Sequence, residues 1–380
     1  MGIRRLAALL GTAAVVLAGC SGGSPSPSGG TGSSDCVVAV SWNNFQQPRW
    51  AAADKPNIQK VVEDAGAKYI DADANLSNEQ QITDVNTLIS KGAKVLILLA
   101  QDTQAVLPAV QTAKDAGIPI IAYDRLIEDP DTLYITFDNV KVGEAEAQAI
   151  LDKVPTGKYV LIKGDPGDPN ASTFLPQGWD NAGLADKVAS GDITLLNGPD
   201  GTFTDKWATE TAQANMEAII DKAKADGNTI DAILAENDST ALGVVGALTS
   251  KSYGFPPLSG QDGDKANLNN VALGKQYVDV WKNANELGKA AGQAALDLCA
   301  GKAMADISIN IDSSVAPLAG NSPTDFTTPG GNTVKSLILQ PTPITADTLD
   351  KVMSAGWWVT KDDICTGVTA SDPGAAACGL

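Results

Sequence analysis

The sequence contains no histidine, and its 27 Lys and Arg stand against 45 Asp and Glu, which gives a formal charge of −18. Without histidine, a Ser-His or Cys-His nucleophile and a His-containing zinc site are excluded. The acidic balance argues against nucleic acid or an anionic membrane surface as the main partner, because both would repel the chain. Beyond the N-terminal segment, no hydrophobic run approaches the roughly 20 residues that span a bilayer.

The composition that remains is that of a globular protein. The chain has 380 residues, of which 43% are hydrophobic and 19% charged. A chain of this length is expected to form about two domains of ordinary size. The apolar content is sufficient for a sizeable core, so disorder throughout the chain is excluded.

The N-terminus has the pattern of an export signal. Arg4 and Arg5 precede an apolar stretch at residues 6–17, which is too short to cross a membrane but fits a signal-peptide core. The stretch ends in Leu-Ala-Gly-Cys at 17–20, which resembles the bacterial lipobox, although a plain secretory signal with an incidental cysteine would look similar. We therefore expect a signal peptide at 1–19, a lipidated Cys20, and a Gly/Ser/Pro-rich flexible tether within 20–35.

Four cysteines remain in the exported chain, where disulfides are permitted. Cys365 and Cys378 lie thirteen positions apart in a tail rich in Gly and Ala, where a disulfide would tie down an otherwise frayed end. This spacing favours their pairing. Whether Cys36 and Cys299 pair stays open, since four cysteines allow three pairings.

Short apolar runs alternate with helical patterns along the body of the chain. The first series predicts four strands, at 37–42, 69–72, 95–99 and 119–123. Three helices are predicted between them, at 49–65, 78–90 and 103–116. A second series, joined to the first near 139–145, predicts strands at 159–163, 193–196, 232–235 and near 258–260, with helices from about 174, at 205–225 and at 239–250. The non-alternating strands are typical of parallel sheets covered on both faces. Later elements at 276–281, 284–300, 307–311 and 337–339 are expected to complete the two sheets.

Polar side chains follow most of these strands, and in open α/β sheets ligands bind at the carboxyl ends of strands. The groups there are amides, carboxylates and cations without a nucleophile and base, which suits a polyhydroxylated ligand, because each hydroxyl both donates and accepts. Trp50 and Trp207 lie at expected helix starts among polar neighbours. They could pack on the two faces of a sugar ring, although core packing is the plainer interpretation.

Two of these polar segments could have a purely structural role instead of binding a ligand. Asp124 and Arg125 could form no more than a loop ion pair, and the Asn237 segment could serve only to cap a helix. We expect Asp238 or Ser239 to be the cap, which leaves Asn237 free to face a cleft. The acidic clusters lack metal-binding spacing, so neither a metal nor a cofactor is expected.

Together these segments resemble the type I periplasmic sugar-binding proteins of ABC importers, from about residue 37 to 300 and more weakly to 349. The pieces that carry the resemblance are Pro-Arg-Trp at 48–50, Ala-Tyr-Asp-Arg at 122–125, the run at 134–143, Gly-Gln-Asp at 260–262 and Trp-Lys at 281–282. The resemblance implies two doubly wound Rossmann-like α/β domains joined by a multi-strand hinge. The implied lobes are 36–140 plus 283–308 and 141–282 plus 309–355, followed by a tail at 356–380.

The resemblance also implies an aldose ligand, D-xylose first. It implies a ligand-binding role for ten residues: Arg49, Trp50, Asp124, Arg125, Asp168, Asn170, Trp207, Asn237, Asp262 and Lys282. Trp50 and Trp207 would stack on the sugar, and the others would bind its polar groups. The chain departs from the family pattern in its first loop at 42–50, at Asn283 and in a long Gly/Pro/Ser-rich stretch at 313–333.

The sequence therefore predicts a monomeric, lipid-anchored receptor outside the cytoplasm that closes on its sugar and delivers it to an ABC permease. It would meet the membrane only through the lipid, and nucleic acid is not a partner. The alternative is a secreted carbohydrate-active enzyme that uses Asp124 and Asp262 as acid and base. A transcriptional regulator of the same fold would need an N-terminal helix-turn-helix, but a signal peptide occupies that place.

Overall fold

A computed structural model describes residues 35–380. The expected signal peptide, Cys20 and nearly all of the expected tether lie outside the described residues. In the part of the chain that is described, no helix is both long and apolar enough to cross a membrane.

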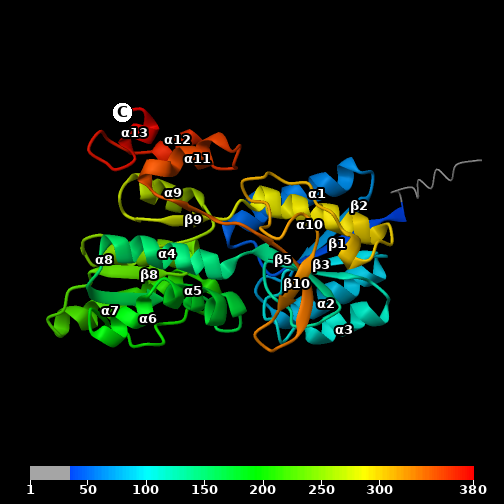
Figure 1. Cartoon of the computed structure of the whole chain (residues 1–380), viewed down its shortest axis with the longest axis horizontal. Helices are drawn as coiled ribbons and strands as arrows, with labels where there is room; N and C mark the ends of the chain where they lie inside the picture. The colour runs from blue at the N-terminus through cyan, green and yellow to red at the C-terminus, as the bar shows by residue number, and fades with distance from the viewer. Residues whose placement is uncertain (1–34) are drawn as a thin grey trace, which may run out of the picture. The chain divides into compact units, whose positions relative to one another are not determined.

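The first lobe is built on a seven-stranded sheet in the order β10-β11-β5-β4-β3-β1-β2 (Figure 1). Its strands are β1 Val37–Trp42, β2 Lys68–Asp73, β3 Val95–Leu98, β4 Ile120–Tyr123, β5 Thr132–Phe137, β10 Thr324–Thr327 and β11 Thr333–Leu339. The helices that accompany it are α1 Lys55–Asp64, α2 Asn78–Ser90, α3 Leu107–Asp115 and α10 Ala284–Cys299. All neighbouring strands are parallel except β10 and β11.

The second lobe contains a three-stranded parallel sheet, β7-β6-β8, and a separate antiparallel pair, β12-β9. Its strands are β6 Gly157–Ile162, β7 Ile193–Leu195, β8 Ala232–Ala235, β9 Asp279–Trp281 and β12 Thr342–Ile344. Its helices are α4 Asn139–Lys153, α5 Leu175–Asn181, α6 Leu184–Ser190, α7 Thr209–Ala225, α8 Asp238–Ser250 and α9 Lys265–Ala272. Three short helices form the tail: α11 Leu349–Ser354, α12 Lys361–Cys365 and α13 Ala375–Cys378.

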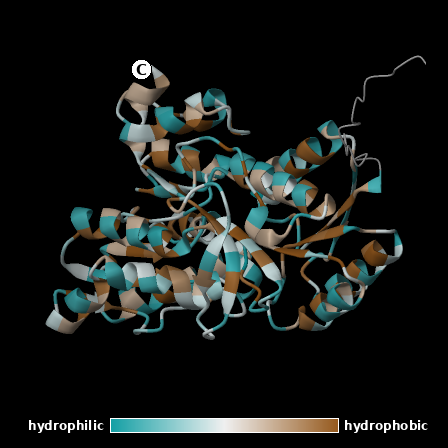
Figure 2. Cartoon of the chain, turned by 45° about the vertical axis from the view of Figure 1, so that its right-hand side comes forward, coloured by the Kyte–Doolittle hydropathy of each residue, from teal (hydrophilic) through white to brown (hydrophobic). Residues whose placement is uncertain are grey.

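The central strands of the first sheet are buried on both faces, as their sequences predict. Val38 and Val40 of β1 lie in one hydrophobic cluster, while Ala39 between them lies in the cluster on the other face. This arrangement explains why the strands are continuously apolar, since each side of the sheet is covered. The helices carry both hydrophobic and hydrophilic residues, as expected for elements with one buried side (Figure 2).

The lobe assignment of the late segments needs one correction. Residues 309–355 were expected in the second lobe, but β11 pairs with β5, so residues up to 339 complete the first sheet. The expected strand at 307–311 is absent, and Ile307, Ile309 and Ile311 instead fill the first lobe's core without strand pairing. The chain thus passes between the lobes at 138–139, 282–283 and 340–341, as residues 35–380 trace it.

Helices α4 and α9 were not expected from the sequence, and neither were strands β5, β10 and β12. The joint near 139–145 is the first part of α4, whose N-cap Asp138 accepts a hydrogen bond from the Lys141 amide. Helix α9 follows the Gly-Gln-Asp segment at 260–262. Both helices belong to the second lobe, so the chain changes lobes just before α4 rather than within a loop.

Two disulfides fix the ends of the described chain. Cys365 is bonded to Cys378, the pairing that their spacing favoured. Cys36 is bonded to Cys299, a pairing that the sequence left open, and it links the start of β1 to the end of α10. Both ends of the described chain are therefore held to the fold by covalent bonds.

Candidate functional site

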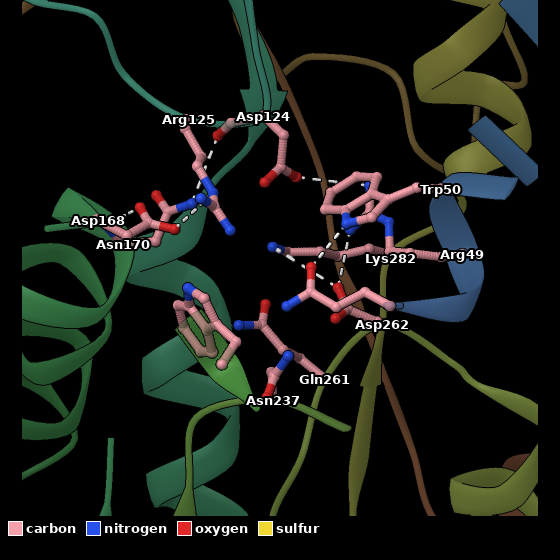
Figure 3. Close-up of a pocket in the computed structure, with 12 residues that line it drawn as sticks. Arg49, Trp50, Asp124, Arg125, Asp168, Asn170, Asn237, Gln261, Asp262 and Lys282 are labelled. Carbon is pink, nitrogen blue, oxygen red and sulfur yellow. Dashed lines mark hydrogen bonds and ion pairs between the residues drawn. The ribbon is translucent and has the colours of Figure 1, made fainter. Parts of the chain in front are cut away.

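The structure places all ten candidate side chains around one polar cavity (Figure 3). The cavity is lined by Gln47, Arg49, Trp50, Asp124, Arg125, Asp168, Asn170, Trp207, Asn237, Gln261, Asp262 and Lys282. The first five come from the first lobe and the other seven from the second. Each of the twelve is less than 10% exposed, so the lobes close over the cavity.

These residues lie where strands end, because parallel strands bring their carboxyl ends to one edge of a sheet. Asp124 and Arg125 directly follow β4, and Asn237 and Lys282 follow β8 and β9. Trp50 and Asn170 each begin a short π-helical turn, at Trp50–Asp54 and Asn170–Phe174. Such turns are rare and occur frequently at functional sites.

The backbone is strained at three of the lining residues. Asp124, Trp207 and Asp262 have φ values of 61°, 56° and 113°, a region that non-glycine residues seldom occupy. The described chain has seven such non-glycine residues, so the cavity holds nearly half of them. Strain of this kind persists only where the surroundings enforce it, and it concentrates at binding sites.

Arg49 is the charged centre of the cavity. Its Nη1 donates to Asp262 Oδ1 at 2.8 Å, its Nε and Nη2 donate to Asp54 at 3.2 and 3.1 Å, and its Nη2 lies 3.4 Å from Asp124 Oδ1. Burial disfavours the charge, but these carboxylates outweigh it and raise the pKa of Arg49 above its ordinary value. Its guanidinium also lies 4.2 Å from the ring centre of Trp50. Arg49 is thereby held in one orientation as a permanent cation.

A second ion pair joins the lobes at Arg125. Arg125 Nε lies 2.8 Å from Asp168 Oδ2, while Nη1 donates to the carbonyls of Ala100 and Gln101 at 2.9 and 3.0 Å. Burial raises the pKa of Asp168, and the charge of Arg125 opposes that shift. Asn170 follows in the same loop, where its Oδ1 accepts a hydrogen bond from Asn139 Nδ2 at 3.0 Å. Arg125–Asp168 and Arg49–Asp262 both connect residues of opposite lobes.

The two tryptophans are held by different neighbours. Trp50 Nε1 donates to Gln47 Oε1 at 2.6 Å. The ring of Trp207 packs directly over Gly164, where a β-carbon would come within 2.2 Å of it. Only glycine at 164 lets the ring lie there, which explains why a glycine follows β6 at this point.

Asn237 is also the N-cap of α8, a role that the sequence predicted for Asp238 or Ser239. Its Oδ1 accepts from the Thr240 amide at 2.9 Å. Asp238 Oδ2 instead accepts from the amides of Gly263 and Asp264 at 3.1 and 2.7 Å, which holds the loop that carries Asp262. Asn237 still lines the cavity. Lys282 Nζ completes the site at 3.9 Å from Asp262 Oδ1.

Two cavity groups have no hydrogen-bond partner among the described residues. Gln261 Oε1 is a free acceptor and Trp207 Nε1 is a free donor, and both are buried. A buried polar atom without a partner costs free energy, so a ligand that forms hydrogen bonds with these cavity atoms would be stabilised. A ligand that both donates and accepts in several directions would satisfy them, as a polyhydroxylated molecule does.

A two-lobed α/β chain with a closed polar cavity at its strand ends defines the class of type I solute-binding proteins. The chain belongs to the periplasmic binding protein family, whose domain model, described as a periplasmic binding protein domain, matches residues 38–303. It is 35% identical over 280 residues to the D-xylose-binding periplasmic protein of Escherichia coli, covering 72% of this chain and 81% of that one. It is 29% identical over 354 residues to the multiple sugar-binding periplasmic receptor ChvE of Rhizobium radiobacter, covering 86% and 92%.

Solved structures agree with this assignment. An ABC transporter solute-binding protein from Clostridium phytofermentans with bound β-D-glucose superposes with a TM-score of 0.74 at 30% identity, covering 86% of this chain and 99% of that one. A carbohydrate transporter solute-binding protein from Chloroflexus aurantiacus in complex with D-glucose superposes with a TM-score of 0.69 at 25% identity, covering 88% and 96%.

Two residues that line the cavity, Gln47 and Gln261, were not among the ten candidates. Gln261 precedes Asp262 at a predicted strand end, so its position was a usable signal. Gln47 lies in the first loop, where this chain departs from the family pattern, and no periodic feature distinguishes it from Gln46.

Proposed function

We propose that this protein is an extracytoplasmic, lipid-anchored receptor that captures an aldose between its lobes and delivers it to an ABC importer. The observation that carries the proposal is the closed cavity, in which both lobes supply buried charges and the second lobe supplies unpartnered polar atoms. Trp50 and Trp207 would pack on the sugar ring, while the charged and amide groups would bind its hydroxyls. The sequence relatives that bind D-xylose and other sugars support this substrate class.

D-xylose is the first ligand that we propose. Its pyranose ring bears hydroxyls around its edge and C–H groups on its faces, which suits a cavity with charged groups and two tryptophans.

Lobe closure is the proposed mechanism. Arg49–Asp262 and Arg125–Asp168 form only when the lobes are together, and a sugar that contacts both lobes would favour the same state. The closed state then presents a surface made of both lobes, which the permease would recognise. We expect the protein to act as a monomer, held at the membrane by lipid on Cys20 and using neither a cofactor nor nucleic acid.

The proposal is tested by titrating a panel of pentoses and hexoses while following tryptophan fluorescence, with glycosides included to detect turnover. We expect saturable fluorescence changes with at least one aldose and no conversion of any sugar or glycoside. Turnover of a glycoside would instead favour an enzyme, and a folded protein that responds to no sugar would refute the proposal.

A further inference from the structure

The C-terminal tail packs beside α9, the helix that begins directly after the loop carrying Asp262 (Figure 1). Trp357 lies between α11 and α12, is 6% exposed, and donates from Nε1 to the Gly263 carbonyl at 2.8 Å. Gly263 directly follows Asp262, which binds Arg49 across the lobes. The tail therefore holds the backbone next to a cavity side chain, although it does not itself line the cavity.

The backbone that Trp357 holds is strained. Asp262 and Gly263 have φ values of 113° and 84° in succession, a region that Asp seldom occupies. The Asp262 amide donates to the Val280 carbonyl at 3.1 Å, and the Gly263 amide donates to Asp238 Oδ2 at 3.1 Å. These bonds hold the amides of the loop, while Trp357 holds the Gly263 carbonyl. Such strain persists only where the surroundings enforce it, so loss of one bond would let the Asp262 side chain move.

Trp281 connects the tail to the cation on this side of the cavity. Its ring centre lies 5.6 Å from that of Trp357, in an edge-to-face arrangement at 75°. A β-carbon at Gly263 would come within 2.5 Å of Trp281, so this ring packs directly on the loop. Lys282 follows Trp281 along the chain and lies 3.9 Å from Asp262. Trp357 thus contacts the neighbours of both charged residues.

The tail is fixed on α9 by contacts of its own. Asn269 Nδ2 donates to the carbonyls of Ile364 and Thr366 at 2.8 and 2.9 Å. Cys365, which lies between these two residues, is bonded to Cys378. Apolar side chains of the tail share one cluster with those of α9. The disulfide thus holds the tail together at the place where it meets α9.

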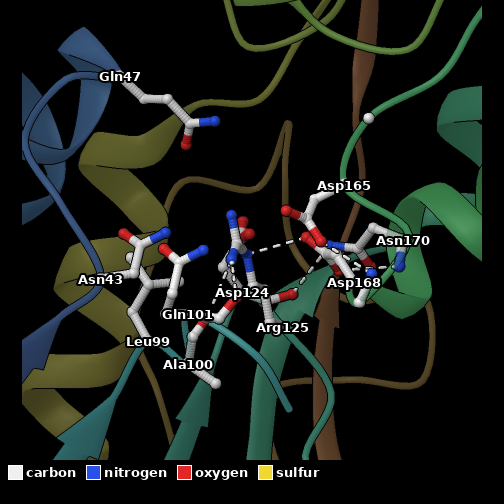
Figure 4. A network of polar contacts seen from close by, with 12 residues as sticks. Asn43, Gln47, Leu99, Ala100, Gln101, Asp124, Arg125, Asp165, Asp168 and Asn170 are labelled. Atoms are coloured by element: carbon white, nitrogen blue, oxygen red, sulfur yellow. Dashed lines mark hydrogen bonds and ion pairs between the residues drawn. The ribbon is translucent and has the colours of Figure 1, made fainter. Parts of the chain in front are cut away.

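The opposite side of the cavity is held within the lobes themselves (Figure 4). Arg125 donates to the Ala100 and Gln101 carbonyls, which lie just after β3 of its own lobe, and pairs with Asp168 at 2.8 Å. The hydrogen bond from the tail falls instead on the Asp262 side.

We propose that the tail braces the sugar site, and that Trp357 is a positioning residue that fixes Asp262 for the ligand and for Arg49. The brace raises sugar affinity without touching the sugar, because a side chain that is already held in place loses little freedom on binding. The disulfide contributes by keeping the tail on α9. This inference rests on the proposed function, since it assigns the support of the same site.

The test isolates the Trp357 hydrogen bond in the full mature protein. Trp357→Phe keeps an aromatic ring beside Trp281 but removes the Nε1 donor. Trp358→Phe is the control, because it makes the same change one residue on, where Nε1 has no partner among the described residues. Each protein is titrated calorimetrically with D-xylose and with any other aldose that the wild type binds, and its melting temperature is measured without sugar. Both substitutions are repeated in an Asp262→Ala background.

We expect Trp357→Phe to lose about 5- to 20-fold in affinity, the effect of one buried hydrogen bond, and Trp358→Phe to stay within about 2-fold of the wild type. In the Asp262→Ala background Trp357→Phe should cost less than about 2-fold, because it then has no carboxylate to position. Cys365→Ser combined with Cys378→Ser leaves Trp357 in place but frees the tail, so it should lower sugar affinity as well.

The outcomes separate this inference from the proposed function. Wild-type affinity in Trp357→Phe would overturn the brace and leave the receptor intact. An equal loss with and without Asp262 would also overturn it, because Trp357 would then act independently of that carboxylate. If Trp357→Phe does not fold, the double cysteine variant decides, since wild-type affinity there overturns the brace and a loss supports it. A wild type that binds no aldose refutes the receptor proposal and this inference with it.

Discussion

Replacing Asp279 by Asn should change how stability depends on pH. Asp279 and Asp238 are both 0% exposed, and their carboxyl groups lie close enough to interact by hydrogen bonding. Asp238 Oδ1 and Asp279 Oδ2 otherwise have no partner, so a proton shared between the two groups would satisfy both. Burial raises the pKa of Asp279 to about 7.

The change of folding stability with pH follows from the difference in protons bound by the folded and unfolded states. An unfolded Asp titrates near pH 3.9, so between about pH 4 and pH 7 the Asp279 carboxyl holds up to one proton more in the folded protein than in the unfolded chain. This contribution to stability is present at low pH and is lost as the pH rises through 7, at up to about 1.4 kcal/mol per pH unit. Between pH 5 and pH 8 the loss should reach about 2–3 kcal/mol.

Asp279→Asn removes this titration and places a permanent amide donor next to Asp238. Relative to the wild type, the variant should therefore gain about 2–3 kcal/mol between pH 5 and pH 8. The measurement is urea unfolding followed by circular dichroism at several pH values without sugar, with exposed Asp200→Asn as the control. Parallel pH profiles for the wild type and Asp279→Asn would refute the shared proton.

Three further predictions concern the cavity and the anchor. Trp50→Ala and Trp207→Ala should each weaken sugar binding by about 1–3 kcal/mol in titration and reduce the sugar-induced fluorescence change, and wild-type affinity in both would reassign them to packing. Gly164→Ala should displace the Trp207 ring, because a β-carbon would lie 2.2 Å from it, and should lower sugar affinity; unchanged affinity would contradict that geometry. Cys20→Ala should release the protein into the medium or leave it unprocessed in cell fractionation, whereas membrane retention of a correctly cleaved variant would argue against the lipid anchor.

Much of the fold was predictable because its signals are local. Continuous apolar runs such as 95–99 and 119–123 predict buried parallel strands, and the polar residues that follow them indicate the binding site. Strand pairing is not local: nothing within 324–339 shows that β11 joins β5 rather than the second sheet. The lobe of that segment could therefore be learned only from the folded chain.

The site was predictable in its members and less so in its details. All ten candidates line the cavity, because strand order brings their positions to one edge. The cap at Asn237 could not be chosen from sequence, since Asn, Asp and Ser side by side are all good caps. The positive φ values of Asp124, Trp207 and Asp262 were also unreadable, because tertiary contacts enforce them.

One pair of measurements tests most directly whether the cavity is the sugar site. D-xylose is titrated calorimetrically into the wild type and Asp262→Ala, and the melting temperature of each is measured without sugar. Asp262 holds Arg49 at 2.8 Å across the lobes, while Arg49 keeps Asp54 when Asp262 is removed. We predict one sugar per wild-type protein, an affinity loss of about 5- to 150-fold in the variant, and little change in melting temperature. A large loss of melting temperature with unchanged affinity would show that Asp262 holds the fold and not the sugar.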